Sequence, residues 1–237
     1  MITVGTIASL WRFPVKSMRG EQLTQAPVDV RGILGDRLYA VRDPDGKLGS
    51  GKNTRRFRRM DGLLDFRARY EAGLTPMITL PDGTEVSGDD EHVDWAIANS
   101  LGRPGVTLVK EDIISHFDEL PLHIVTSASL RWLQDLVPHI EIDERRLRPN
   151  LMIEVAETVG KPEDSWVGRE LHIGTHLVLD VAQRSQRCVM VNQAQEELPE
   201  SNEILHAISE ANDLSLGVHG RVLAPGRIHV GDEVFLA

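Results

Sequence analysis

Residues 3–17 of the chain read TVGTIASLWRFPVKS, an apolar run that ends in a proline, a lysine and a serine. Residues 3–11 have the short apolar pattern of a β-strand. Lys16 and Ser17 follow it, so the stretch predicts a strand whose end presents a cation beside a hydroxyl group.

The rest of the chain predicts many short strands and few helices. Further strands are expected at residues 26–30, 37–42, 77–80, 122–125, 150–155, 171–173 and 176–181. Helices are expected at residues 91–100, with Asp90 as N-cap and Gly102 near the end, and at residues 127–136 and 203–211. Strands and helices alternate too sparsely for a doubly wound sheet, so the predicted fold class is α+β and β-rich.

The composition narrows the possible functions. The net charge of -10 disfavours a general nucleic-acid-binding protein. The single cysteine, Cys188, excludes an intramolecular disulfide, and also an iron–sulfur cluster or Cys-rich zinc site built from this chain alone. A lone cysteine suits a reducing compartment, and we see neither a signal peptide nor an apolar run of roughly 20 residues. A cytoplasmic protein without a membrane partner is therefore expected.

Cys188 is the best candidate for chemistry. Arg184 and Arg187 lie just before it, and a cation beside a thiol favours the thiolate, which is the form that binds metal or attacks a substrate. The alternative is a buried and inert cysteine, because free cysteines are often buried.

Other clusters place lysine or arginine beside small or hydroxyl residues, the combination that phosphate recognition needs. They lie at residues 13–19, 35–37, 50–59 and 146–150. Solvated surface charge is the alternative for each cluster. Like charges gather at a cost unless an anion offsets them. We therefore expect one pocket to be faced by Lys16, Arg37, Lys52, Arg148 and Arg187.

Seven motifs in order resemble those of the MOSC family, named after the C-terminal domain of molybdenum cofactor sulfurase. They are residues 10–17 (LWRFPVKS), 32–37 (GILGDR), 124–130 (IVTSASL), 148–150 (RPN), 163–174 (EDSW to LHIG), 187–188 (RC) and 217–234 (from GVH to GDEV). The resemblance covers nearly the whole chain. It implies a β-barrel-like N-terminal domain at residues 1–103, packed with a MOSC β-barrel domain with a few short helices at residues 104–237.

The resemblance also implies a cofactor and a reaction. The family includes the mitochondrial amidoxime-reducing component and bacterial relatives that reduce N-hydroxylated compounds. By position, Cys188 would supply a thiolate to the metal of a molybdenum cofactor (Mo-molybdopterin). The pterin and its phosphate would be held by Lys16, Ser17, Arg37, Lys52, Arg56, Thr126, Ser127, Arg148, Asn150 and Arg187.

Two departures from the reductases concern substrate and reaction. After the cysteine, the reductases typically have two residues and then Thr-Thr-Val-Asp, whereas residues 189–194 here read VMVNQA. His219 stands where those reductases have tyrosine. It is a candidate catalytic proton donor, with a structural histidine as the alternative. Some longer relatives carry an electron-delivery module that is not found here, so a separate electron-donor protein is expected beside a small-molecule substrate.

Other functions stay open at this point. A molybdenum cofactor carrier or a sulfur-handling protein would use the same residues without turnover of a small substrate. The sulfurase itself joins a MOSC domain to a pyridoxal-phosphate-dependent domain, so pyridoxal phosphate is associated with the family, but this chain is too short to contain both. A nucleic-acid-binding or protein-binding barrel would use the basic residues 52–59. A cysteine hydrolase would pair Cys188 with His176, His206 or His219.

The acidic residues between 196 and 213 form a further feature, with no lysine or arginine among them. A solvated helix face is one interpretation of this stretch. A docking surface for a basic partner is the other.

Overall fold

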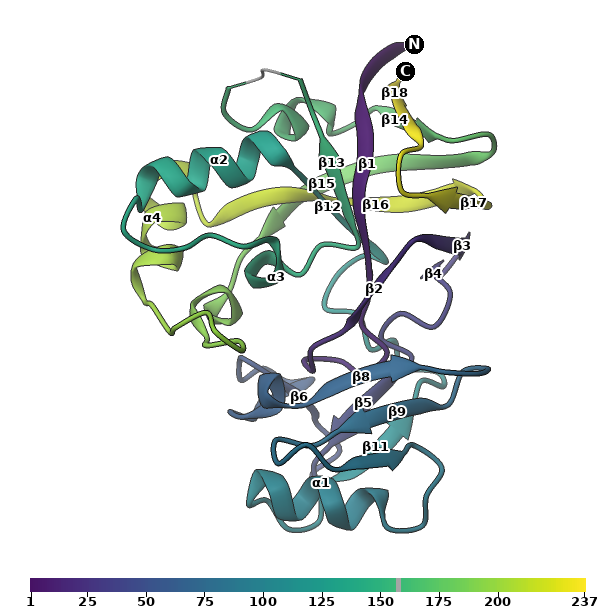
Figure 1. Cartoon of the computed structure of the whole chain (residues 1–237), viewed down its shortest axis with the longest axis vertical. Helices are drawn as coiled ribbons and strands as arrows, with labels where there is room; N and C mark the ends of the chain where they lie inside the picture. The colour runs from purple at the N-terminus through teal and green to yellow at the C-terminus, as the bar shows by residue number, and fades with distance from the viewer. Residues whose placement is uncertain (157–158) are drawn as a thin grey trace. The chain divides into compact units, whose positions relative to one another are not determined.

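The computed structural model describes residues 1–156 and 159–237, whose course Figure 1 shows. They form two compact units. Unit 1 contains residues 1–11, 22–34 and 119–237, and unit 2 contains residues 12–21 and 35–118. The units interleave along the chain, because residues 1–11 and 22–34 make their contacts with the C-terminal part. The predicted β-rich α+β class is confirmed.

Unit 1 is built on a closed barrel of strands. The strands, in chain order, are β1 (Ile2–Arg12), β12 (Leu122–Thr126), β13 (Leu151–Glu154), β14 (Glu170–Ile173), β15 (Leu177–Gln186), β16 (Ser215–Ala224) and β18 (Glu233–Leu236). Neighbours in the sheet follow the order β13-β12-β16-β15-β14-β18-β1, and the pairing of β1 with β13 closes the ring. β2 (Glu21–Leu23) extends the sheet beside β1.

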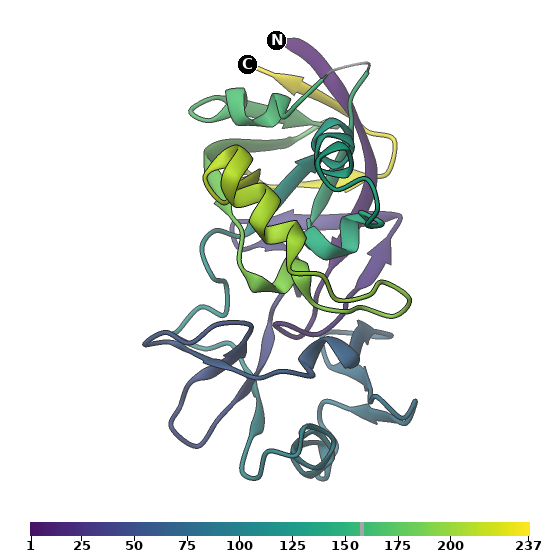
Figure 2. The same ribbon diagram turned by 90° about the vertical axis from the view of Figure 1, so that its left-hand side faces the viewer.

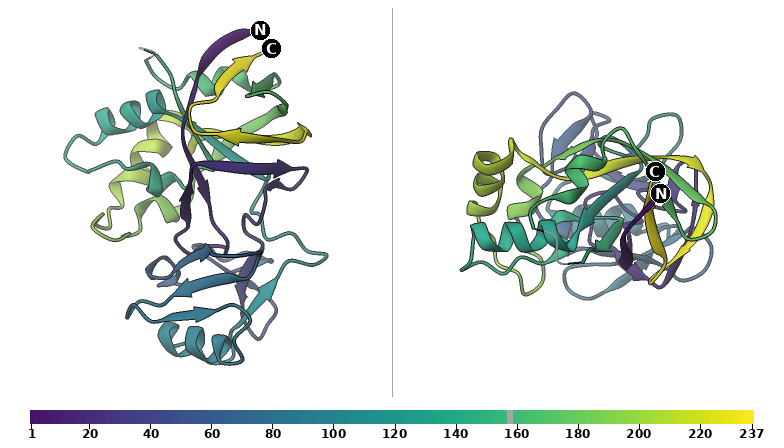
Figure 3. Two further views of the ribbon diagram at one scale, coloured as in Figure 1. Left: turned by 45° about the vertical axis from the view of Figure 1, so that its right-hand side comes forward. Right: turned by 90° about the horizontal axis from the view of Figure 1, so that it is seen from above.

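The first strand, β1, closes this barrel. β1 pairs antiparallel with β13 through Thr6 and Glu154, and antiparallel with β18 through Ile2 and Leu236. The two chain termini therefore lie side by side, as both views in Figure 3 show. The N-terminal strand thus completes a barrel whose other strands come from residues 122–236.

Alternation along the strands fills the barrel with aliphatic side chains. In β15, every second side chain from Leu177 to Val181 is buried. This period of two matches the pleat of a strand with one face in the core. Ile7, Ile124 and Leu179 belong to the same core. Since each buried aliphatic side chain contributes roughly 1.5–3 kcal/mol, this core is a main source of the stability of unit 1.

Helices lie on one side of the barrel, as Figures 1 and 2 show: α2 (Ser127–Leu136), α3 (Glu144–Leu147) and α4 (Glu203–Asn212). They share an apolar cluster that includes Leu133, Ile204 and Ile208. Unit 1 also holds the short sheet of β3 (Gln25–Asp29), β4 (Gly32–Ile33) and β17 (Gly226–His229), and the 3-10 turns η2 (Pro162–Trp166) and η3 (Val189–Asn192). The predicted bounds of α2 are confirmed.

Unit 2 consists of two small sheets, one helix and a 3-10 turn, η1 (Leu63–Asp65). One sheet contains β8 (Arg67–Tyr70), β9 (Pro76–Thr79) and β10 (Glu85–Ser87). The other contains β5 (Tyr39–Arg42), β6 (Leu48–Ser50), β7 (Phe57–Arg59) and β11 (Thr107–Lys110). Ile97 of α1 (Val93–Leu101) belongs to the same core cluster as Val41 and Ile78, so the helix and both sheets share one core. Within the two described ranges, no helix is long and apolar enough to cross a bilayer.

Several predicted boundaries were wrong for local reasons. The strand expected to begin at Arg37 begins at Tyr39, because Arg37 has a left-handed backbone with φ 50°. The helix expected at residue 91 begins at Val93, and Asp90 is not its N-cap, although its carboxylate accepts from the His92 N–H. The expected end at Gly102 is confirmed, with φ 61° in the left-handed region that glycine tolerates. The polar strands β8, β10 and β11 were not predicted, because they are short and only partly buried.

The contact between β1 and β13 gives a test of barrel closure. A Cβ atom at Gly5 would lie 2.1 Å from the backbone oxygen of Glu154. Gly5→Ala should therefore lower the free energy of unfolding by about 2–4 kcal/mol. Gly220→Ala on β16 is the matched control, because its Cβ would meet Ile124 at an ordinary 3.5 Å. Urea denaturation of both variants checks this, and equal losses would contradict a tight β1–β13 contact.

Candidate functional site

The predicted site residues are divided between the two units. Cys188, Arg187, His219, Thr126, Ser127, Arg148 and Asn150 belong to unit 1. Lys16, Ser17, Arg37, Lys52 and Arg56 belong to unit 2.

The Arg187 side chain contacts three other residues of unit 1. It follows the end of β15, and its guanidinium donates to the backbone oxygen of Leu147 at 2.6 Å and to Ser185 Oγ at 3.0 Å. A third contact, at 3.0 Å, reaches Nε2 of His123. The backbone N–H of Arg187 donates to the Leu214 oxygen at 2.6 Å. Arg187 thus ties the chain just before Cys188 to the barrel and to the end of α3.

His123 was not among the predicted site residues. It is the second residue of β12 and is buried, and the donor Arg187 at Nε2 requires that nitrogen to be an acceptor. The proton of the neutral ring then lies on Nδ1, which faces the Arg148 oxygen at 3.4 Å. Gly217 makes room for the ring, since a Cβ there would lie 2.7 Å from His123 Nε2. A histidine in an apolar strand gives little signal in sequence, because its partner Arg187 is 64 residues away.

Arg148 and Asn150 lie where α3 turns into β13. Arg148 is buried and has a left-handed backbone with φ 54° as the C-cap of α3. The side chain of Asn150 accepts from the His123 N–H at 3.1 Å and donates to the Trp11 oxygen at 3.2 Å. The structure therefore joins Arg148, Asn150, Arg187 and His123 into one hydrogen-bonded group. Their predicted contacts with a cofactor stay a prediction.

Thr126 and Ser127 begin α2. The Thr126 hydroxyl donates to the Glu163 carboxylate at 2.7 Å and accepts from the Ser129 N–H at 3.2 Å, as an N-cap does. Burial raises the pKa of Glu163, while the bonds from Ser129 and Thr126 oppose that rise. Ser127 Oγ accepts from the Val155 N–H at 3.1 Å and keeps its own proton as a donor. The proton of Thr126 is used inside the fold, so Ser127 is the hydroxyl of this pair that retains a donor.

Cys188 is half-buried and is the N-cap of the 3-10 turn η3. Its backbone oxygen accepts from the Val191 N–H at 3.2 Å, which holds the residue at the start of the turn. Within residues 1–156 and 159–237, no three His, Cys, Asp or Glu side chains are placed to hold a metal ion. The role of Cys188 as a metal ligand stays a prediction.

His219 lies on β16 directly opposite His123 on β12, and their ring centroids are 5.2 Å apart. The His219 side chain is 14% exposed, and its Nε2 lies 3.8 Å from a carboxylate oxygen of Glu119. The same oxygen accepts from Gln183 Nε2 at 2.5 Å. A protonated Nε2 of His219 would thus face a fixed carboxylate. This geometry suits a proton donor, and the catalytic role stays a prediction.

Three cations surround one aromatic ring in unit 2. Lys16 Nζ, the Arg56 guanidinium and Lys52 Nζ lie 4.5, 4.9 and 5.5 Å from the centre of the Phe57 ring. The negative face of an aromatic ring attracts cations, so Phe57 helps to hold them together. Arg56 also donates to the Ser115 and Phe117 backbone oxygens. We call Lys16, Lys52, Arg56 and Phe57 the cation cluster.

Asp118 supplies a carboxylate to the cation cluster. Its two oxygens lie 2.7 Å from Lys16 Nζ and 3.2 Å from Lys52 Nζ. Burial lowers the pKa of Lys16 to about 8, although Asp118 raises it. Burial raises the pKa of Asp118, but the charges of Lys16 and Lys52 outweigh this and hold it well below its usual range. Asp118 was missed in the sequence because 102 residues separate it from Lys16.

Arg37 and Ser17 have left-handed backbones, with φ 50° and 66°. The Arg37 guanidinium pairs with Asp36 and lies 4.7 Å from the centre of the Phe13 ring. Ser17 Oγ donates to the Gly49 oxygen at 3.2 Å. Such backbones in non-glycine residues cost energy, and they persist where the surrounding contacts hold them, often at ligand sites.

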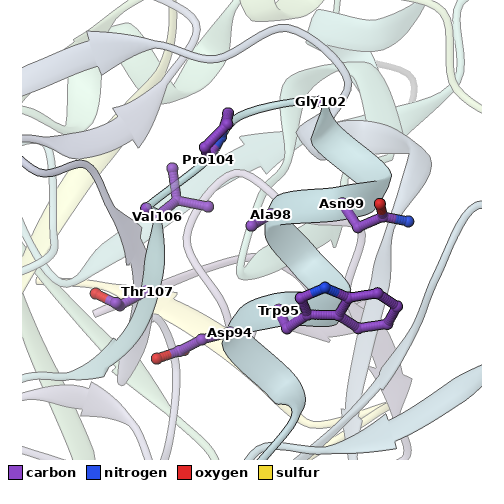
Figure 4. A pocket seen from close by; sticks show the side chains of 9 residues that line it. Asp94, Trp95, Ala98, Asn99, Gly102, Pro104, Val106 and Thr107 are labelled. Atoms are coloured by element: carbon purple, nitrogen blue, oxygen red, sulfur yellow. The ribbon is translucent and has the colours of Figure 1, made fainter.

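The groove beside α1 and the acidic stretch are two other surface features. A groove of about 580 Å³ beside α1 is lined by Asp94, Trp95, Asn99 and Thr107 among others, as Figure 4 shows. It includes none of the predicted site residues.

The acidic stretch is partly neutralised, because Arg145 pairs with Glu196 at 2.6 Å and with Glu197 at 2.5 Å. These two charges therefore offer less to a basic partner than the sequence suggested.

The contacts of Arg187 predict the effect of a conservative change. In Arg187→Lys, one ammonium group cannot reach Leu147, Ser185 and His123 together. We expect the free energy of unfolding to fall by about 1–3 kcal/mol. We also expect faster amide hydrogen exchange in residues 187–192. Arg221→Lys is the control, because Arg221 is exposed and has one ion pair with Asp180. Unchanged exchange in residues 187–192 would show that Arg187 does not fix this segment.

The titration of Lys16 gives a second test. Lys16 should titrate near pH 8, and Asp118→Asn should lower its pKa further, because the carboxylate raises it. A lysine in the unfolded chain titrates near 10.5, so between these values the unfolded chain binds more protons. The free energy of unfolding of the original chain, compared with that of Lys16→Met, should therefore rise between pH 8 and 10.5. Lysine side-chain NMR and urea denaturation measure the two effects, and a Lys16 pKa at its ordinary value would contradict the buried pair.

Comparison with known proteins places the chain in a family. Residues 4–103 match the MOSC N-terminal beta barrel domain, and residues 111–235 match the MOSC domain. The chain is 26% identical to mitochondrial amidoxime-reducing component 1 of Mus musculus and of Homo sapiens, over 98% of this chain and 82% and 83% of those proteins. The crystal structure of the YUAD protein from Bacillus subtilis shares the fold, with a TM-score of 0.55, 16% identity, and coverage of 98% of this chain and 95% of that one. The chain belongs to the MOSC-domain family.

Proposed function

We propose that this chain binds a molybdenum–pterin cofactor and acts as an oxidoreductase that reduces N-hydroxylated compounds. The proposal is supported by similarity to the amidoxime-reducing component over nearly the whole chain. The single structural observation that carries it is the anchoring of Arg187. Its guanidinium and backbone bonds hold the residue directly before Cys188. A metal ligand must be held in a fixed place, and the anchored Arg187 fixes the backbone next to the half-buried thiol of Cys188.

The residues present fit such a cofactor. A pterin phosphate is an anion, and the cation cluster offers three positive charges against the single carboxylate of Asp118. Lys16 is only 2% exposed, and a buried ammonium group is retained where it has an anionic partner. Cys188 matches the soft thiolate ligand that such metal sites use. We propose that Cys188 ligates the metal. The organic part would be held by Lys16, Ser17, Arg37, Lys52, Arg56, Thr126, Ser127, Arg148, Asn150 and Arg187.

The reaction divides between the cofactor and the chain. When bound, the molybdenum cofactor supplies the redox centre for an overall conversion of N–OH, two electrons and two protons to N–H and water. His219 would hold one of these protons on Nε2, oriented by the Glu119 carboxylate at 3.8 Å. Gln183 holds that carboxylate in place through its bond at 2.5 Å.

The electrons would come from a separate donor protein. The chain has one cysteine, so it cannot build an iron–sulfur relay of its own. The exposed Glu200 and Glu210 are the parts of the acidic stretch that we propose for contact with a basic donor, since Arg145 already pairs with Glu196 and Glu197.

The metal-ligand role is tested by Cys188→Ser. A hydroxyl is a poorer ligand for this metal than a thiolate, so molybdenum content should fall several-fold in protein from a host that makes molybdopterin. Reduction of benzamidoxime with a chemical electron donor should fall at least as far. Val189→Ala in the same turn is the control and should keep both metal and activity. Equal molybdenum in the Ser variant and the original chain would reject the ligand role.

The same preparation separates catalysis from cofactor handling. Metal-loaded protein that reduces no N-hydroxylated compound with any donor would support a carrier or sulfur-handling protein. The half-buried thiol of Cys188 is compatible with that function. Turnover with a chemical donor would reject it.

A further inference from the structure

Asp118 has an unusual position in the cation cluster, because its carboxylate takes the place that an anionic ligand would need. Its oxygens contact both ammonium groups, at 2.7 Å from Lys16 and 3.2 Å from Lys52. Lys52 Nζ and Lys16 Nζ also share the Phe57 ring, so an anion at this point meets two cations at once.

The two sides of this ion pair differ in exposure. The Lys16 side chain is 2% exposed and is held within the fold, whereas the Asp118 side chain is 43% exposed. Asp118 is the more accessible member of the pair, so its carboxylate can exchange these contacts for water at a smaller cost than Lys16 can. A buried ammonium group left without an anion loses much more. Asp118 can therefore leave the cluster only if another anion replaces it.

The charges in the cluster determine which anion can do so. Lys16, Lys52 and Arg56 carry three positive charges when protonated, and Asp118 offsets one of them. Arg37 also acts on Lys16, but its own charge is paired with that of Asp36. A monoanion that displaces Asp118 only exchanges one negative charge for another. A dianionic phosphate adds a charge, so only the dianion gains electrostatic energy from the exchange.

We propose that Asp118 is a specificity-determining residue, an internal anion that a phosphate group must displace from Lys16 and Lys52. It excludes carboxylates and other monoanions from the cluster and admits phosphate monoesters or free phosphate. The inference deepens the proposed function, because the phosphate of the pterin cofactor is one source of this group. The competition itself rests on the contacts of unit 2 and does not require a bound metal.

Calorimetric titration of the full chain, made in a host without molybdopterin, tests the competition with inorganic phosphate and acetate as probes. The original chain should bind phosphate and show no heat with acetate. Asp118→Asn should bind phosphate about tenfold more tightly and should also bind acetate. Asp112→Asn is the matched control, because it removes the same charge from the same exposed segment, and it should behave like the original chain. Unchanged phosphate affinity and continued exclusion of acetate in Asp118→Asn would overturn the proposal, as would the same gains in Asp112→Asn.

A second measurement needs no variant, in case Asp118→Asn folds poorly. Carbodiimide should couple the Asp118 carboxylate to Lys16 or Lys52 in the original chain, because the atoms already touch. Sulfate, a dianion that does not react with carbodiimide, should reduce this cross-link several-fold relative to chloride at equal ionic strength. A cross-link that sulfate leaves unchanged would show that the dianion does not displace Asp118.

The source of the phosphate is assigned by repeating the phosphate titration with cofactor-loaded protein. Loss of phosphate binding on loading would identify the cofactor phosphate as the displacing group. Undiminished binding in loaded protein would assign the site to a separate phosphate ligand and would contradict the role of the cluster in holding the cofactor. Absence of molybdenum from every preparation would reject the proposed function and leave the titrations of the cofactor-free chain valid.

Discussion

Closure of the barrel by β1 is the constraint on which the rest of unit 1 depends. β1 pairs with β13 on one side and β18 on the other, so the first residues of the chain complete a ring whose other strands come from its second half. A closed ring leaves no unpaired edge and fixes the register of each strand against both neighbours. That register places His123 opposite His219, and it holds the end of β15, from which Arg187 and Cys188 follow.

The basic side chains of the two units have different kinds of partner. Arg187 uses its donors within unit 1, on a histidine, a serine and a backbone oxygen, so it positions the chain around Cys188. Lys16 is buried beside a carboxylate that is itself partly exposed, so its charge can be shared with an incoming anion. The first arrangement makes a fixed scaffold, and the second makes a site whose internal partner is exchangeable. Lys16 thus differs from the solvated surface charge that was the alternative for its cluster.

The sequence predicted regular elements better than it predicted partners. The bounds of α2 and the strand at β12 followed from apolar periodicity, which is a local signal. The left-handed backbones of Ser17, Arg37 and Arg148 could not be predicted, because residues other than glycine rarely adopt this conformation. His123 and Asp118 were missed because each acquires its role from a cation more than 60 residues away. The cations themselves were found because the family motifs carry them.

The molybdenum and pterin content of the unaltered chain decides whether it binds the proposed cofactor. The protein should be purified from one host that makes molybdopterin and from another in which that synthesis is blocked. We predict close to one molybdenum and one pterin per chain from the first host and neither from the second. Well-folded protein that carries no molybdenum and no pterin from the first host would contradict it.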